Sequence, residues 1–202
     1  MPSNMAGMPA AVLALKRYND GAGLIQKLGA EQMPQAVAKA ETIYGNITAF
    51  PTLKGTAAAL GRNQVTVWIS KLLHNTALWA GINLSPTVTD KETGMTVNMD
   101  AERMNQTAEA IQTAAPWLTT PEVLIFLQRF KEGRYERFYG TYNPQVVMQS
   151  LQQYLKERET EIQRIDRERQ HRKIMQEAAE AKRNAITREQ WEAIKAKQQQ
   201  TD

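Results

Sequence analysis

Residues 63–82 read NQVTVWISKLLHNTALWAGI, and this stretch gives the clearest folding signal in the chain. Its apolar side chains recur three and four positions apart, so they share one side of a helix with about 3.6 residues per turn. The members of this stripe are Val65, Trp68, Ile69, Leu72, Leu73, Leu78 and Trp79. Because so wide a stripe is typical of a core helix, we expect a helix over residues 64–82 within an all-α fold.

The segments on either side of this helix also carry helical patterns. Residues 31–47 repeat the helical spacing, and Phe50-Pro51 ends that pattern because the residue before a proline is pushed out of helical geometry. Residues 52–61 predict a short alanine-rich helix with Gly61 as its stop. Residues 83–98 lose the periodicity and predict a loop, with a short hairpin centred on Lys91-Glu92-Thr93-Gly94.

Helix start signals are clear in the second half of the chain. Asp100 is the expected cap of a helix that runs to about Ala115. Thr119 or Thr120 caps the next helix, where Pro121 occupies the first position as helix starts prefer. That helix is expected to run to Lys131 and to stop at Gly133.

The last sixty residues predict a short final helix capped by Thr187, preceded by one long helix that loses its apolar face with distance. Asn143-Pro144 starts the long helix, and no proline or glycine follows before the end of the chain. Beyond about Ile165 the residues are mostly Arg, Glu, Gln, Lys and Ala, a composition typical of a solvated helix. We therefore expect a small helical bundle with a long charged C-terminal helical tail, divided into residues 1–61, 62–160 and 161–202.

Composition and motif content argue against an enzyme. The 202 residues contain no cysteine, which excludes disulfides and thiolate metal sites. The two histidines, His74 and His171, have no companion ligand at metal-binding spacing. Phosphate-binding loops, dinucleotide fingerprints and nucleophile elbows are missing from the sequence. We expect no catalytic residue, no cofactor and no metal.

Charge and hydropathy bound the partners. The formal net charge of +4 permits contact with nucleic acid without forming a strongly basic surface. No run of about 18 apolar residues occurs, so we expect no membrane partner. The absence of cysteine fits a reducing compartment, so we expect a cytoplasmic location.

Residues 129–140 read RFKEGRYERFYG and form the first candidate site. Four basic residues interleave here with four aromatic residues, the side chains that bind phosphates and stack under bases of single strands. The predicted nucleic-acid-binding residues are Arg129, Lys131, Arg134, Tyr135, Arg137 and Tyr139. In the alternative interpretation the aromatic rings fix an inter-helix loop onto the core while the cations stay solvated. The two interpretations are compatible.

A second candidate lies in residues 52–73, which can be interpreted as a helix-turn-helix with its turn at residues 61–63. Gln64, Thr66 and Lys71 would then reach base edges. The apolar residues at the start of the second helix favour a buried bundle helix instead.

The third candidate is the tail from Arg164 to Asp202, whose charges nearly balance. As an extended helix it suits coiled-coil pairing or docking to a larger protein. The predicted partner-binding residues are Arg169, Arg172, Trp191 and Ile194. A solvated helix without a partner is the alternative.

Several stretches between residues 65 and 158 together carry a resemblance to a known family. They are Val67-Trp68-Ile69, residues 104–111, residues 118–123 with Phe126 and Phe130, Lys131-Glu132-Gly133-Arg134-Tyr135, Tyr139, residues 147–154 and Glu157-Arg158. In this order, residues 65–158 resemble a family of small uncharacterised helical proteins from bacteriophages and integrative elements. The family loop usually reads Lys-x-Gly-Lys-Tyr-Gly, whereas Glu136 replaces the second glycine here and Asn143 stands where an aspartate is common.

The resemblance implies a role in DNA replication. Members of that family look like replication accessory proteins, and their helical outline is similar to helicase loaders that lack ATPase activity. Our leading hypothesis is a helicase loader or primosome component that binds single-stranded DNA through residues 129–140 and a replicative helicase through its tail. The alternatives are a helix-turn-helix transcription regulator and an assembly protein that oligomerises through its C-terminal helix.

Overall fold

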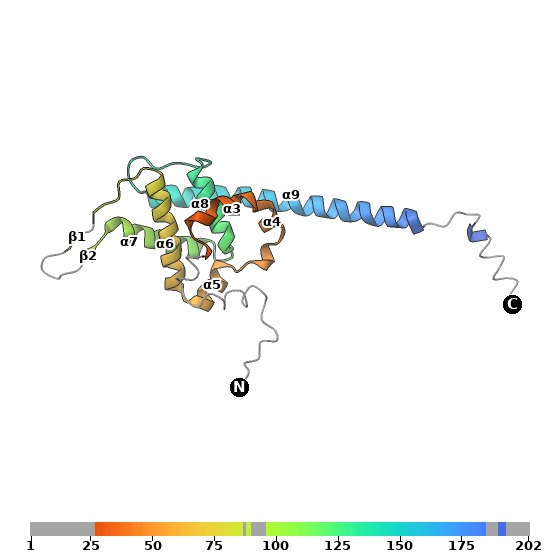
Figure 1. Cartoon of the computed structure of the whole chain (residues 1–202), viewed down its shortest axis with the longest axis horizontal. Helices are drawn as coiled ribbons and strands as arrows, with labels where there is room; N and C mark the ends of the chain where they lie inside the picture. Colours follow the sequence, from red (N-terminus) through yellow and green to blue (C-terminus); the bar gives the residue numbers. More distant parts are fainter. Residues whose placement is uncertain (1–26, 87, 90–95, 185–189, 193–202) are drawn as a thin grey trace, which may run out of the picture. The chain divides into compact units, whose positions relative to one another are not determined.

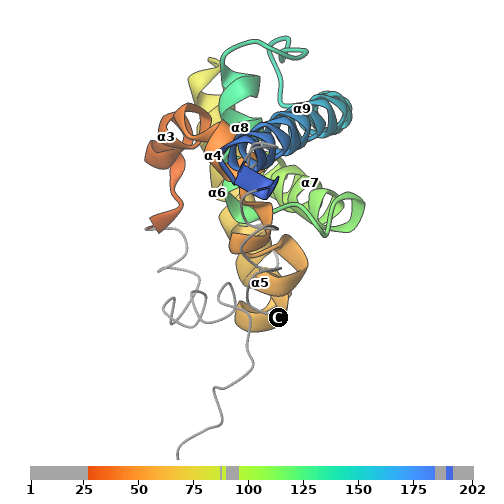
Figure 2. The ribbon, with the colours of Figure 1, turned by 90° about the vertical axis from the view of Figure 1, so that its right-hand side faces the viewer.

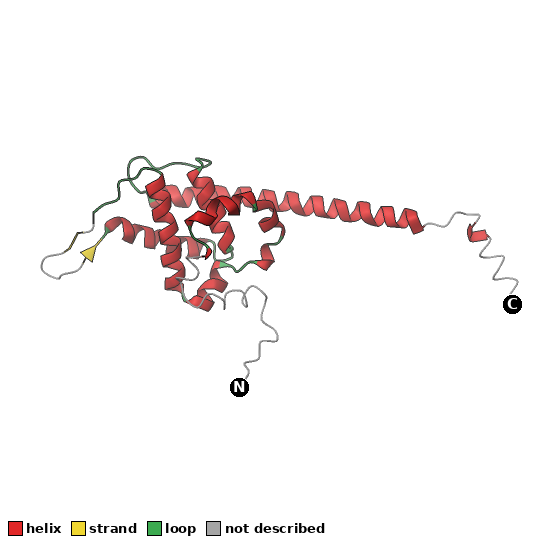
Figure 3. Cartoon of the chain, in the orientation of Figure 1, coloured by secondary structure: helices red, strands yellow, loops and turns green. Residues whose placement is uncertain are grey.

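The computed structural model describes residues 27–86, 88–89, 96–184 and 190–192 (Figure 1). The chain separates into two compact units, Met1–Glu161 and Ile162–Asp202, and each is described by itself. Helices account for nearly all of the regular structure, which confirms the all-α prediction (Figure 3). In the described part of the chain the β-structure is one antiparallel pair of two-residue strands, β1 (Val88–Thr89) and β2 (Thr96–Val97).

Helix α6 (Arg62–Trp79) forms on the stretch that dominated the sequence pattern. The first part of its stripe is buried, with Val65, Trp68 and Ile69 fully covered. Its buried side packs against α5 (Leu53–Leu60) and α7 (Met99–Ala114). The helix ends at Trp79, three residues before the predicted end, because Gly81 adopts a φ of 73° and the N–H of Ile82 then bonds back to the carbonyl of Ala77.

The helix at the centre of the first unit is α8 (Thr120–Lys131), and ten of its twelve residues are buried. It packs against α3 (Met33–Ala38), α4 (Ala40–Gly45) and α6, and Figure 2 shows α3 and α7 on opposite sides of it. Thr119 starts α8 as predicted, since its backbone N–H and its hydroxyl both donate to Glu122. The backbone of Leu53 also bonds to Leu118, so α5 and α8 begin side by side.

Two predicted helices differ from the structure in detail. Residues 31–47 form α3 and α4 rather than one helix, with a 3₁₀ turn at each end, because Lys39 leaves helical geometry at a φ of −104° and a ψ of 12°. The cap of α7 is Asn98, whose side chain accepts the N–H groups of Asp100 and Ala101. Asp100 lies in the first turn, where its carboxylate accepts the N–H of Ser85. The predicted hairpin residues 91–94 lie outside the described residues, although the strands on either side of them do pair.

Helix α9 (Pro144–Asn184) is the long C-terminal helix that the sequence predicts. In the first unit it buries Val147, Leu151 and Tyr154, which belong to the core. In the second unit most of its side chains are polar or charged and exposed, and i,i+4 ion pairs such as Arg164–Glu168 lie along its surface. No helix in the described ranges is both long and apolar enough to cross a bilayer.

Candidate nucleic-acid interface

The loop that follows α8 starts at a glycine that no other residue replaces without strain. Gly133 has a φ of 75°, and its N–H bonds to the carbonyl of Phe130 while the N–H of Arg134 reaches that of Arg129. A β-carbon at Gly133 would meet no atom within 4 Å, so the constraint is the backbone conformation alone. Glu136 stands where the resemblance expects a second glycine, and it does not adopt a positive φ, because the positive-φ residues in the described part of the chain are all glycines.

Three of the four loop aromatics predicted to fix the loop onto the core do so. The ring of Phe138 lies 5.1 Å from that of Phe130 and 5.3 Å from that of Tyr142, measured between centroids. The ring of Tyr135 lies 6.1 Å from that of Phe126. Because these rings are buried, the loop is held in one position by packing. Tyr139 is different: it is 72% exposed.

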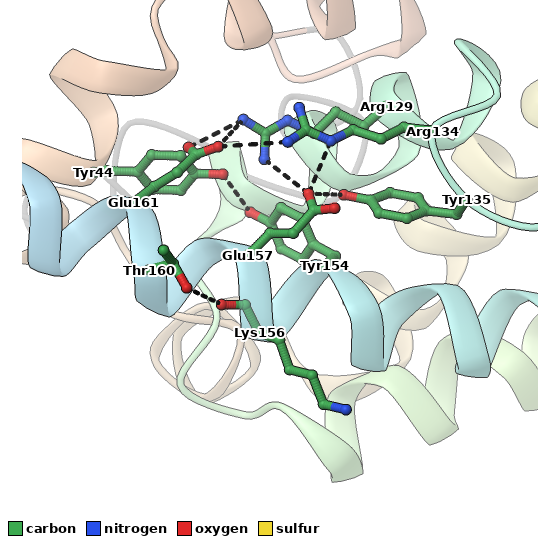
Figure 4. Close-up of polar contacts among 9 residues, drawn as sticks. All are labelled: Tyr44, Arg129, Arg134, Tyr135, Tyr154, Lys156, Glu157, Thr160 and Glu161. Atoms are coloured by element: carbon green, nitrogen blue, oxygen red, sulfur yellow. Dashed lines mark hydrogen bonds and ion pairs between the residues drawn. The ribbon is translucent and has the colours of Figure 1, made fainter.

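Arg129 turns away from the surface into an ion-pair network with α9 (Figure 4). Its guanidinium donates to both oxygens of Glu161, at 2.9 and 3.1 Å, and lies 3.8 Å from a carboxylate oxygen of Glu157. Burial alone would lower the pKa of Arg129, but its contacts with Tyr44 and Glu161 raise it above its ordinary value. This side chain is 7% exposed, so it is a structural cation that a nucleic acid does not reach in this conformation.

Two other predicted site residues belong to the same network. The hydroxyl of Tyr135 donates to Glu157 at 3.1 Å, and burial together with that carboxylate raises the pKa of Tyr135. Arg134 is half-exposed, but its Nε lies 2.9 Å from a carboxylate oxygen of Glu157. Glu157 therefore neutralises part of the positive charge that the sequence assigned to a phosphate-binding surface.

A pair of tyrosines continues the network into the core. The hydroxyl of Tyr44 on α4 donates to that of Tyr154 on α9 at 3.3 Å, and the guanidinium of Arg129 lies 5.8 Å from the Tyr44 ring centroid. Burial raises the pKa of Tyr44 to about 12. Tyr154 is fully buried, and burial raises its pKa as well. Together these contacts fasten α4, α8 and α9 to one another within the first unit.

Arg137 is exposed and Lys131 is half-buried, and each of these cations lies over an aromatic ring. The ammonium of Lys131 is 5.6 Å from the ring centroid of Trp79, and the guanidinium of Arg137 is 5.7 Å from that of Tyr139. Trp79 is 62% exposed. No carboxylate forms an ion pair with either cation within the described ranges; Lys131 donates instead to the side-chain oxygen of Asn75 at 3.2 Å. Burial lowers the pKa of Lys131 below its ordinary value.

A cavity of about 190 Å³ lies at the end of α6. Trp79, Lys131 and Arg137 line it, together with the buried rings of Phe130 and Phe138. Sequence reasoning missed Trp79 because its helical spacing placed it in the core stripe. Gly81 lies two residues after Trp79 and ends the helix, so it is the sequence signal that Trp79 lies at the end of the apolar stripe. We call Trp79, Lys131, Arg137 and Tyr139, of which Lys131 is half-buried and the others are exposed, the aromatic-basic surface.

The helix-turn-helix residues are placed less favourably for reading DNA. Gln64 and Lys71 are exposed, but Thr66 is buried and its hydroxyl accepts the side-chain N–H of Gln112 at 2.9 Å. Val65, which follows Gln64, is completely buried against the rest of the first unit. Thr66 is therefore committed to the contact between α6 and α7.

The predicted partner-binding residues lie in the second unit. Arg169, Arg172 and Trp191 are exposed there, with Trp191 at 51%. Two further apolar side chains, Ile174 and Met175, are 55% and 57% exposed. Ile194 lies outside the described residues. Groups of three His, Asp or Glu side chains placed to hold a metal ion do not occur in the described part of the chain.

Comparison with known proteins gives one match. Residues 98–201 match the model of a family of unknown function, DUF6633. No curated protein and no solved structure matches the chain. The matched region contains α7, α8, the loop and α9, and so includes the ion-pair network from Arg129 to Glu161.

Proposed function

The chain belongs to the DUF6633 family of unknown function, and we propose that it is a non-enzymatic accessory protein of DNA replication that binds single-stranded DNA through its aromatic-basic surface. The observation that carries the proposal is that two exposed rings each lie under a cation that forms no ion pair in the described ranges, Trp79 under Lys131 and Tyr139 under Arg137. Exposed rings stack on bases and cations bind the phosphates between them. The resemblance to phage and integrative-element proteins supports the link to replication.

The buried aromatic rings support this role indirectly. Phe130, Phe138 and Tyr135 hold the loop against the core, so the two cations are presented on a rigid support. A fixed surface loses less conformational entropy when a flexible strand binds to it. Lys131 also contributes its charge from a partly desolvated position, where electrostatic attraction to a phosphate is stronger than in open water.

The surface suits a single strand better than a duplex. Two exposed rings, of which Trp79 lines the cavity, can stack only on unstacked bases, since the faces of paired bases are covered in a duplex. Glu132 and Glu136 lie on the same loop, so the local positive charge is modest. We therefore expect stacking and phosphate contacts to contribute together.

Salt dependence tests the proposal. We expect labelled oligo-dT to bind the full-length protein with an affinity that falls as salt rises, and each phosphate contact contributes about 0.7 to the log–log slope. Lys131→Ala and Arg137→Ala should each reduce that slope. Lys54→Ala removes an exposed lysine of α5 that lines a different cavity and should leave the slope unchanged. Absence of binding to any single strand at low salt would refute the proposal.

In this proposal the second unit contacts a protein partner, a replicative helicase. The support is its exposed apolar side chains, Ile174, Met175 and Trp191, spaced among charged residues of a helical segment. The same residues favour the assembly protein as a second candidate function, because they also suit self-association. Sedimentation of the full chain separates the two: a stable oligomer that dissociates on truncation after Ile162 favours assembly, and a monomer favours an external partner.

A further inference from the structure

The cavity at the end of α6 has the size and lining of a site for one small planar group. It encloses about 190 Å³, whereas sites for drug-sized ligands enclose about 300–1,000 Å³. Two buried rings, Phe130 and Phe138, line it 5.1 Å apart, and Trp79 lines it from the solvent side. An enclosure made from aromatic rings favours a flat, polarizable occupant.

The charges at this cavity indicate that the planar group is attached to an anion. Lys131 and Arg137 both line it, and neither has a carboxylate partner in the described ranges. A phosphodiester beside the cavity would be bound by these two cations while the ring it carries enters. An uncharged apolar peptide side chain would leave the two charges partly desolvated without compensation.

We propose that this cavity binds one unstacked nucleobase of the single strand, with the flanking phosphates on Lys131 and Arg137. The inference rests on the proposed function and adds a specific subsite to it. The described polar groups of the cavity offer little to read a base edge, because Thr76 is buried and its hydroxyl already donates to the carbonyl of Leu72 at 2.8 Å. The subsite therefore accepts any base, with affinity that follows stacking.

Ala80 provides a way to close the cavity without altering the binding side chains. It is exposed, follows the last residue of α6 and lines the cavity. Its backbone conformation is one that larger residues adopt without strain. Ala80→Phe and the smaller Ala80→Leu both place an apolar side chain there. Ala80→Ser is the matched control, because it changes the residue and leaves the cavity open.

The experiment compares oligo-dT with a chain of the same length made of abasic deoxyribose phosphates, both on the full-length protein. We expect the wild type to bind oligo-dT at least about fivefold more tightly, since stacking on one aromatic group contributes a factor of that order or more. Ala80→Phe and Ala80→Leu should reduce the affinity for oligo-dT towards that for the abasic chain, which they should leave unchanged. Ala80→Ser should behave as the wild type.

Three other outcomes overturn the inference, and they are distinguishable. Equal affinity of the wild type for the two chains would show binding by phosphates alone and leave the proposed function standing. A preference for oligo-dT that persists in both filling variants would place the base contacts outside the cavity. Failure to bind either chain would refute the proposed function and the subsite together.

Discussion

Arg129 on α8 and Glu161 on α9 are joined by two hydrogen bonds of 2.9 and 3.1 Å across 32 residues of sequence. The arginine side chain is 7% exposed and the glutamate side chain 26%. Arg129 therefore relies on this ion pair to offset its burial, whereas Glu161 is partly solvated. A buried cation is stabilised only while its carboxylates are in place. The packing of α8 against α9 in the first unit is therefore sensitive to the loss of Glu161.

Loss of that partner should destabilise the protein more than loss of the cation. We expect Glu161→Ala to lower the free energy of unfolding by about 3 kcal/mol, because it leaves Arg129 buried with only the more distant Glu157. Arg129→Met should cost less, since Glu161 is partly solvated and the methionine fills the space. Urea denaturation measures both. The control is Lys156→Ala, which should change stability by less than about 0.5 kcal/mol, because the Lys156 side chain points away from the network in Figure 4. A larger loss for Arg129→Met than for Glu161→Ala would contradict the view that Arg129 is a buried cation that needs Glu161.

Tyr44 makes stability depend on pH in the alkaline range. The pKa of its hydroxyl is about 12 in the folded chain against an ordinary value of 10.0. Between these values the folded state keeps a proton that the unfolded state has released, so the free energy of unfolding falls as pH rises from 10 to 12. The loss from this one group is roughly 2–3 kcal/mol. Tyr44→Phe should flatten the stability profile above pH 10 relative to the wild type; an unchanged slope would show that Tyr44 ionises normally.

Local chemistry made much of the fold predictable. The start of α8 follows from Thr119, Pro121 and Glu122, because caps and first-turn residues act within a few positions of one another. The stop at Gly133 follows from the need for a left-handed residue after a helix. The all-α class and the long last helix follow from periodicity and from the lack of helix breakers after Pro144.

The site was less predictable because its chemistry depends on distant partners. The sequence shows that Arg129, Tyr135 and Arg134 lie in an aromatic-basic run, but not that Glu157 and Glu161 meet them from another helix. Trp79 presents the opposite problem. Periodicity places it on the apolar stripe of α6, yet it does not show where the covering helices end, and this ring is 62% exposed.

The cost of replacing Gly133 should depend only on how readily the new residue adopts a left-handed backbone conformation. Its φ of 75° is left-handed and a β-carbon would contact nothing, so we expect Gly133→Asn to cost less than Gly133→Val. The difference should be about 1 kcal/mol, since β-branched residues fit this conformation poorly and asparagine is one of the few that adopt it. Thermal denaturation of the two variants measures it. Equal losses would indicate a steric restriction that the open space around this glycine contradicts.

Trp79 should contribute to DNA binding and little to stability. It is 62% exposed with the Lys131 ammonium over its ring, and its replacement removes a stacking platform of about 1–3 kcal/mol per base. We expect Trp79→Ala to weaken oligo-dT binding by at least about fivefold at constant salt, by anisotropy, with an unfolding midpoint close to that of the wild type. Trp117→Ala is the matched control, because Trp117 is 45% exposed with the Arg158 guanidinium 4.6 Å from its centroid. Equal weakening by both variants would mean that a cation over an exposed ring does not identify the binding surface.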